Sequence, residues 1–259
     1  AATNNVLLID GGGITGGAVL TNEEPFTVGV TGRSNNQVTF ANGARIFSGS
    51  GSIGNGSSYN TVSVGSNSIW NQGPNGRMTF GGGTGNVLIV NGGTVTNGQT
   101  SSSGDPGLSV YGLSNRVVIS QGGILEQTGY VAAHGTPEAH IGFYTTYNQV
   151  LLTDTGSVWD VDVMRVGEQG GAFNSVIISN GAIARFAQVN VASTWSPGSN
   201  NSLIVTGSGS LLANSPYGIS WGIGVGAGIG NSMTIARGGA VVVGTSSVEN
   251  RIGYGGREN

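Results

Sequence analysis

One pattern of polar and apolar positions recurs along the whole chain. A polar residue, usually Asn, is followed by two aliphatic residues separated by one position and then by a glycine turn. Successive copies start 24 to 33 residues apart, with a mean of about 28. Such repetition predicts that residues 1–259 form a single repeat domain. The nine copies begin at Asn4, Asn36, Asn60, Gly85, Asn115, Asn148, Asn174, Asn201 and Asn231.

The third and fifth positions of every copy are apolar. Side chains of a β-strand alternate between two faces, so this spacing predicts a strand whose third and fifth residues point into a core. The second position is polar in all nine copies and is expected to face solvent. The predicted inward pairs are Val6/Leu8, Val38/Phe40, Val62/Val64, Val87/Ile89, Val117/Ile119, Val150/Leu152, Val176/Ile178, Leu203/Val205 and Met233/Ile235.

Two further β-like runs follow the first strand in many copies. The second comes after the glycine turn, as in Val158–Trp159, and the third ends in an aliphatic residue followed by glycine, as in Val166–Gly167. Three short strands per coil predict an all-β fold, a right-handed parallel β-solenoid (β-helix) of about nine coils spaced about 4.8 Å apart. A β-sandwich is the alternative, but its alternating connections would not repeat one signature in one phase nine times.

Composition narrows the classes of function. Glycine accounts for 50 residues and only 8% are charged, against about 25% charged in ordinary domains, which disfavours helical and typical enzyme folds. A net charge of −3 lacks the basic excess of nucleic-acid binding, and the short apolar runs predict no membrane insertion. The absence of Cys and Lys excludes disulfides, thiolate metal sites and Schiff-base chemistry. We therefore expect no cofactor and no metal.

The repeat resembles that of known surface proteins. The pattern N-x-[VLM]-x-[IVLF]-x-x-G-[GAS], followed by a spacer and [IV]-G, is similar to the repeat shared by autotransporter (type V secretion) passenger domains and PEP-CTERM-sorted surface proteins. The resemblance implies a parallel β-helix outside a bacterial cell, with no catalytic residues. The chain starts at Ala1 rather than Met, which fits export after removal of a signal peptide. We expect a secreted, extracellular or cell-surface protein.

The acidic cluster of the chain offers an enzyme alternative. Asp160 and Asp162 alternate with apolar residues, so an unbroken strand would place both carboxylates on one face, roughly 7 Å apart. Such a pair can act as acid and base or hold a hard cation. The competing interpretation is a solvated strand face.

The longest coil contains the remaining candidates. His134 and His140 flank Glu138 and could ligate zinc, but their six-residue spacing across a proline-containing loop favours a plain insertion. Phe143, Tyr144 and Tyr147 cluster in one inter-coil loop. They would form either a sugar-binding platform or packing over a coil edge.

The leading hypothesis is a non-catalytic structural protein that self-assembles into an extracellular filament. The alternatives are an adhesin-like module that binds a glycan or surface, and a carbohydrate-active enzyme centred on Asp160 and Asp162. The expected partner is the chain itself. Head-to-tail stacking is expected to use the open strand edges at Asn4, Val6, Leu8 and Ile252. Lateral assembly is expected to use the apolar fourth repeat positions Leu7, Leu88, Val118, Leu151, Ile177 and Ile204.

Overall fold

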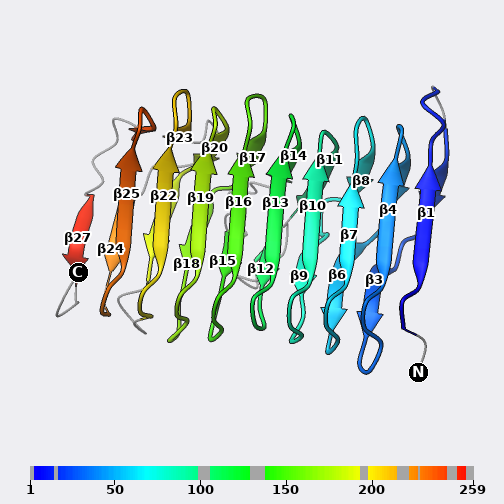
Figure 1. The fold of residues 1–259 in the computed structure, drawn as a ribbon, viewed down its shortest axis with the longest axis horizontal. Helices are drawn as coiled ribbons and strands as arrows, with labels where there is room; N and C mark the ends of the chain where they lie inside the picture. The colour runs from blue at the N-terminus through cyan, green and yellow to red at the C-terminus, as the bar shows by residue number, and fades with distance from the viewer. Residues whose placement is uncertain are drawn as a thin grey trace.

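The structure is a computed structural model that describes residues 3–14, 17–98, 106–128, 138–192, 198–214, 222–226, 228–243 and 250–254. These residues form β-strands and turns and contain no helix. Figure 1 shows the strands as successive coils in one row, with the two chain ends at opposite ends of it. The predicted all-β parallel solenoid is confirmed.

Three parallel sheets run the length of the solenoid, and each has nine strands within the described residues. The first strand of every coil belongs to sheet A. Its members are β1 (Val6–Asp10), β4 (Gln37–Ala41), β7 (Thr61–Val64), β10 (Val87–Asn91), β13 (Arg116–Ser120), β16 (Gln149–Thr153), β19 (Ser175–Ser179), β22 (Ser202–Thr206) and β25 (Ser232–Ala236).

The second and third strands of each coil form the other two sheets. Sheet B contains β2 (Val19–Thr21), β5 (Arg45–Phe47), β8 (Ile69–Asn71), β11 (Thr94–Gly98), β14 (Ile124–Thr128), β17 (Val158–Asp160), β20 (Ile183–Phe186), β23 (Leu211–Asn214) and β26 (Ala240–Val242). Sheet C contains β3 (Pro25–Val30), β6 (Ser50–Asn55), β9 (Met78–Phe80), β12 (Leu108–Val110), β15 (Glu138–Ile141), β18 (Val163–Val166), β21 (Gln188–Val191), β24 (Gly222–Gly226) and β27 (Arg251–Tyr254).

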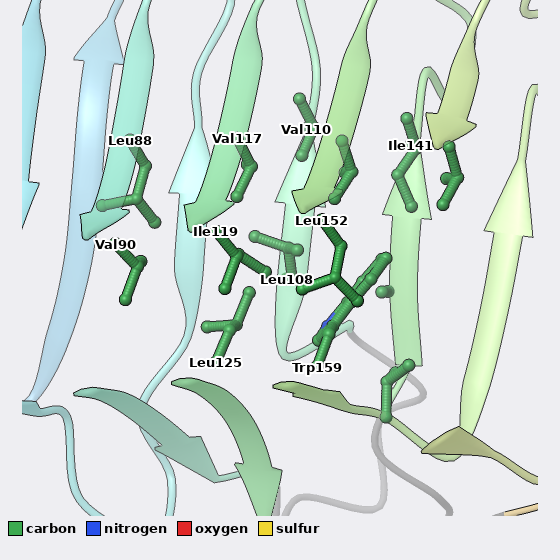
Figure 2. Packing of buried hydrophobic residues seen from close by; sticks show 14 of the residues in the cluster. Leu88, Val90, Leu108, Val110, Val117, Ile119, Leu125, Ile141, Leu152 and Trp159 are labelled. Carbon is green, nitrogen blue, oxygen red and sulfur yellow. The ribbon is translucent and has the colours of Figure 1, made fainter. Parts of the chain in front are cut away.

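The core is one continuous apolar column between the three sheets. In-register parallel pairing places equivalent residues of successive coils beside one another, as in Val150 beside Val176. Figure 2 shows such side chains from several strands meeting in the interior, with the Trp159 ring among them. Near the first coils, Phe40 and Trp70 pack edge to face with ring centroids 5.6 Å apart. Because each layer rests on the next, the core stabilises axial continuity of the coils.

The predicted phase is wrong by one residue in two copies. Val6 pairs with Gln37, so the first copy aligns from Asn5 rather than Asn4. The fourth copy likewise aligns from Asn86, and its buried pair is Leu88 and Val90 instead of Val87 and Ile89. Both copies contain four consecutive apolar residues after two candidate start positions. Without polar–apolar alternation, the sequence pattern does not fix which face is buried.

Candidate functional site

A ladder of asparagines, buried in every coil after the first, runs along the corner between sheets C and A. The backbone N–H of each of the first eight ladder residues donates to the Oδ1 of the following ladder Asn, over 2.7–3.4 Å. In most coils the side-chain Nδ2 donates to the same oxygen. The ladder therefore links coils in one direction along the axis. Its members are Asn5, Asn36, Asn60, Asn86, Asn115, Asn148, Asn174, Asn201 and Asn231.

The sequence analysis located this column but did not recognise it as a hydrogen-bonded ladder. Once the first and fourth copies are shifted by one residue, the ladder position is Asn in all nine copies. A surface turn would accept several polar residue types at such a position. Invariance of one amide within the chain was therefore the available signal for a buried role.

The residue before each ladder Asn has left-handed backbone geometry. The φ angles at this position lie between 54° and 71° in all nine coils. Asn, Gly and Ser occupy six of these positions, and Asn and Gly take this conformation at low cost. Tyr59, Tyr147 and Phe173 occupy the other three, although bulky residues rarely adopt positive φ. We call these nine residues the corner row: Asn4, Asn35, Tyr59, Gly85, Ser114, Tyr147, Phe173, Asn200 and Gly230.

Aromatic side chains gather at this corner in two neighbouring coils. The rings of Tyr147 and Phe173 are stacked at 8°, with centroids 5.0 Å apart. Tyr144, on the same loop as Tyr147, packs edge to face on Phe143 and donates a 3.3 Å hydrogen bond to Gln169 Oε1. Phe143 is partly buried, whereas Tyr144, Tyr147 and Phe173 are 67%, 55% and 48% exposed. The expected aromatic cluster thus includes Phe173, which lies 26 residues after Tyr147.

A charged network supports the aromatic cluster from the outer face of sheet C. Arg165 on β18 binds both carboxylate oxygens of Glu138, over 2.9 and 3.1 Å. A third Arg165 nitrogen donates to Glu168 Oε1 over 3.0 Å. His140 Nε2 lies 2.8 Å from Glu138 Oε2, and its ring stacks on Phe143. We call Glu138, His140, Arg165 and Glu168 the Glu138 network.

The electrostatics of this network favour the ionised carboxylate. Burial raises the pKa of Glu138, but hydrogen bonds from His140 and Arg165 outweigh burial and hold the pKa below its ordinary value of 4.5. Burial lowers the pKa of Arg165, and its contacts with Glu138 and Glu168 more than offset this effect, so that its pKa is raised. Glu138 and Arg165 therefore form a charged pair at pH 7.

The described part of the chain does not contain a set of side chains that could ligate zinc. Among these residues, no three His, Cys, Asp or Glu side chains are placed to hold a metal ion. His140 and Glu138 bind each other, and His134 lies outside the described residues.

The predicted acidic pair does not share a face. Asp160 ends β17 on the outer side of sheet B, where its Oδ2 accepts a 3.0 Å hydrogen bond from Arg185. Asp162 lies in the following corner and is buried. The expected spacing assumed an unbroken strand, but the chain turns between sheets B and C after Asp160. The structure therefore gives the enzyme alternative no acid/base pair at these two residues.

The residues expected at the solenoid ends are exposed, but their orientation requires correction. Leu7 pairs with buried Val38 and lies on the inward side of β1. Val6 and Leu8 consequently lie on the outward side, and Asn4 belongs to the corner row rather than the ladder. At the other end, Ile252 pairs with buried Val225 and lies on the inward side of β27.

The expected lateral ridge needs the same one-residue correction. Leu88 is fully buried and Leu7 faces inward, so neither belongs to the outer surface of sheet A. Ile89 takes the place of Leu88, because it pairs directly with Val118. Five partly buried aliphatic residues then form a continuous outer ladder on consecutive coils: Ile89, Val118, Leu151, Ile177 and Ile204.

Comparison with known proteins adds little to this geometry. No family model and no curated protein matches the chain. A solved structure of the TibC-catalysed, hyper-glycosylated TibA55-350 fragment aligns over 97% of this chain and 99% of that chain, at 15% identity and a TM-score of 0.20. A match this weak assigns neither family nor function. In the described residues, no helix is long and apolar enough to cross a membrane.

Proposed function

We propose that this chain is a non-catalytic structural solenoid of the bacterial exterior, which works as a stiff rod. The observation that carries the proposal is the Asn ladder, in which each coil is hydrogen-bonded to the next through buried amides. Buried and fully paired amides specify one axial register and resist shear between coils. The sparse charge and the abundance of Gly, Asn, Ser and Thr, a composition common in surface fibres and stalks, support a location outside the cell.

The rod is proposed to lengthen by edge-to-edge pairing of its terminal coils with further coils. Within the described residues, the first and last strands of each sheet pair on one side only. Val6 and Ile252 are 74% and 83% exposed. A cavity of about 340 Å³, lined by Leu7, Phe26 and Val28 among others, opens at the first coil. Open strand edges around an uncovered core accept another coil, whichever polypeptide supplies it.

Electron microscopy of the purified 259-residue chain over a range of concentrations tests this pairing. We expect linear particles one solenoid wide at high concentration. Leu7→Asp should abolish them, because this side chain would be buried between stacked coils. Leu8→Asp is the matched control on the outward side of the same strand and should still assemble. Wild-type particles that stay monomeric at millimolar concentration would refute edge-to-edge pairing.

The outer ladder of sheet A is proposed as a lateral contact between rods. Its five aliphatic residues extend over roughly 20 Å at the spacing of parallel strands. Replacing Leu151 and Ile177 by Lys should keep linear particles single while leaving their length unchanged. Thr39 and Ser63 hold the same position in the second and third coils, so a Thr39→Lys, Ser63→Lys variant is the control. Bundling that persists after the Leu151 and Ile177 substitutions would exclude this face.

A further inference from the structure

The aromatic residues in the corner row occupy positions that the fold itself would fill with small or amide residues. Tyr147 and Phe173 have φ angles of 61° and 56°, where the other coils mostly carry Asn, Gly or Ser. A bulky side chain at positive φ carries an energetic cost that the small and amide residues of the other coils largely avoid. The exposed ring then recovers little of this cost by burial, since about half of each side chain remains in solvent. The solenoid corner therefore does not require aromatic residues at these two positions.

Each ring of the stacked pair keeps part of a face accessible. Rings in full face-to-face contact would lie about 3.5–4.0 Å apart. The 5.0 Å separation of the Tyr147 and Phe173 centroids at 8° indicates an offset stack. Tyr144 adds a third exposed ring, three residues from Tyr147 and so within about 11 Å along the backbone. Two neighbouring coils thus expose three aromatic rings close to one corner of the solenoid.

Hydrogen-bonding groups border this surface. In the corner row, Ser114 precedes the stacked pair by one coil and Asn200 follows it by one coil, and both are exposed. The Tyr144 hydroxyl and the Gln169 side chain, already hydrogen-bonded to each other, lie on the side facing sheet C. The border therefore supplies hydroxyl and amide groups, which both donate and accept hydrogen bonds.

The charged side chains beneath this aromatic surface form ion pairs with one another. Arg165 is bound to Glu138 and Glu168, and His140 is bound to Glu138. The ring of His140 stacks on Phe143, against which Tyr144 packs. The Glu138 network thus fixes the position of Tyr144, and its Glu138 and Arg165 side chains are already paired with each other.

We propose that Tyr144, Tyr147 and Phe173 form a binding site for a neutral carbohydrate. A pyranose ring has an apolar C–H face that packs on aromatic rings and a rim of hydroxyls that bind amide and hydroxyl groups. This corner offers a partner for both features, whereas a charged ligand would find Arg165 and Glu138 already paired with each other and a lipid would meet a polar border. The site is separate from the edges used for end-to-end pairing, because Tyr144, Tyr147 and Phe173 lie on two adjacent coils in the middle of the solenoid.

A glycan array probed with the monomeric chain tests the proposal. The array carries neutral hexose and N-acetylhexosamine oligosaccharides, with sialylated and sulfated oligosaccharides for comparison. We expect saturable binding to neutral oligosaccharides, followed by calorimetric titration with the best tetrasaccharide. No binding to any saccharide, or binding confined to charged ones, would overturn the proposal. The proposal would also be overturned if the chain bound peptides and no saccharide.

Substitutions that respect the backbone assign the binding to this surface. Tyr147→Asn and Phe173→Asn keep a residue type that the corner row uses at positive φ, so folding should be preserved. Their combination should weaken binding by about tenfold or more, and Tyr144→Asn should weaken it further. Tyr59→Asn is the matched control, because Tyr59 is 59% exposed at φ 57° in a remote coil. An equal loss in the control, or none in the Tyr147 and Phe173 variants, would refute the site.

Discussion

Gly167 lies directly against the side-chain amide of Asn201, which is 34 residues further along the chain. A Cβ atom added to Gly167 would overlap the Cγ, Oδ1 and Nδ2 atoms of Asn201, and the glycine φ is 73°. Gly142 has the same relationship with Asn174. The aliphatic–glycine ending of the third strand therefore has a physical cause: the missing side chain makes room for the asparagine ladder.

Substitution at Gly167 should be costly for this reason. Gly167→Ala is expected to lower the free energy of unfolding by more than about 2 kcal/mol, because it combines positive φ with displacement of a buried amide. Gly170→Ala is the control, since Gly170 has φ 83° and nothing within 4 Å of an added Cβ. Chemical denaturation of both variants separates the backbone cost from the overlap. Equal losses would mean that contact with Asn201 contributes nothing.

Loss of one ladder amide should destabilise the whole solenoid. Asn174 Oδ1 accepts hydrogen bonds from the backbone and side-chain nitrogens of Asn148, and its own Nδ2 donates to Asn201. Asn174→Ala leaves these buried groups without hydrogen-bond partners and should lower the free energy of unfolding by about 2–4 kcal/mol. Asn91→Ala removes an amide from the partly exposed side of β10 and should cost under about 1 kcal/mol. Thermal unfolding followed by circular dichroism would measure both variants.

A core residue should contribute more to stability than the acidic residue of β17, Asp160. Ile178 is fully buried, and Ile178→Ala should lower the free energy of unfolding by about 2–5 kcal/mol. Asp160→Asn removes only the charge from a partly exposed pair with Arg185, so its cost should be under about 1 kcal/mol. Similar midpoint shifts in urea for the two variants would contradict this order and give Asp160 a larger role.

Acid should weaken the fold through Glu138. Its pKa in the folded chain lies below the ordinary value of 4.5. At a pH between these two pKa values, the unfolded chain therefore binds more protons than the folded chain. The stabilisation is complete above about pH 5 and is lost as pH falls through the folded pKa. Glu138→Gln should therefore flatten the fall in unfolding free energy as the pH drops below about 5. Glu23→Gln, at an exposed position, is the control; an unchanged slope in Glu138→Gln would contradict the prediction.

The predicted pair of Asp160 and Asp162 shows that spacing along the sequence predicts a shared face only within one unbroken strand. Alternation in the sequence places Asp160 and Asp162 on one face only if the strand continues, and the corner after Asp160 interrupts it. The Glu138 network illustrates the converse. Glu138 and Arg165 are 27 residues apart and meet because β15 and β18 are adjacent in sheet C. Neither outcome is visible in a window of a few residues.

The sequence by itself determined the class of fold, because period-two apolar positions, glycine turns and a near-constant repeat length are local properties of the chain. It also determined most of the buried positions, such as Val150 and Leu152. The tertiary structure alone decided the phase of the first and fourth copies, where four consecutive apolar residues are equally compatible with either face. Stacking of the coils likewise decided that Tyr147 meets Phe173, since parallel pairing brings together residues that are a whole coil apart.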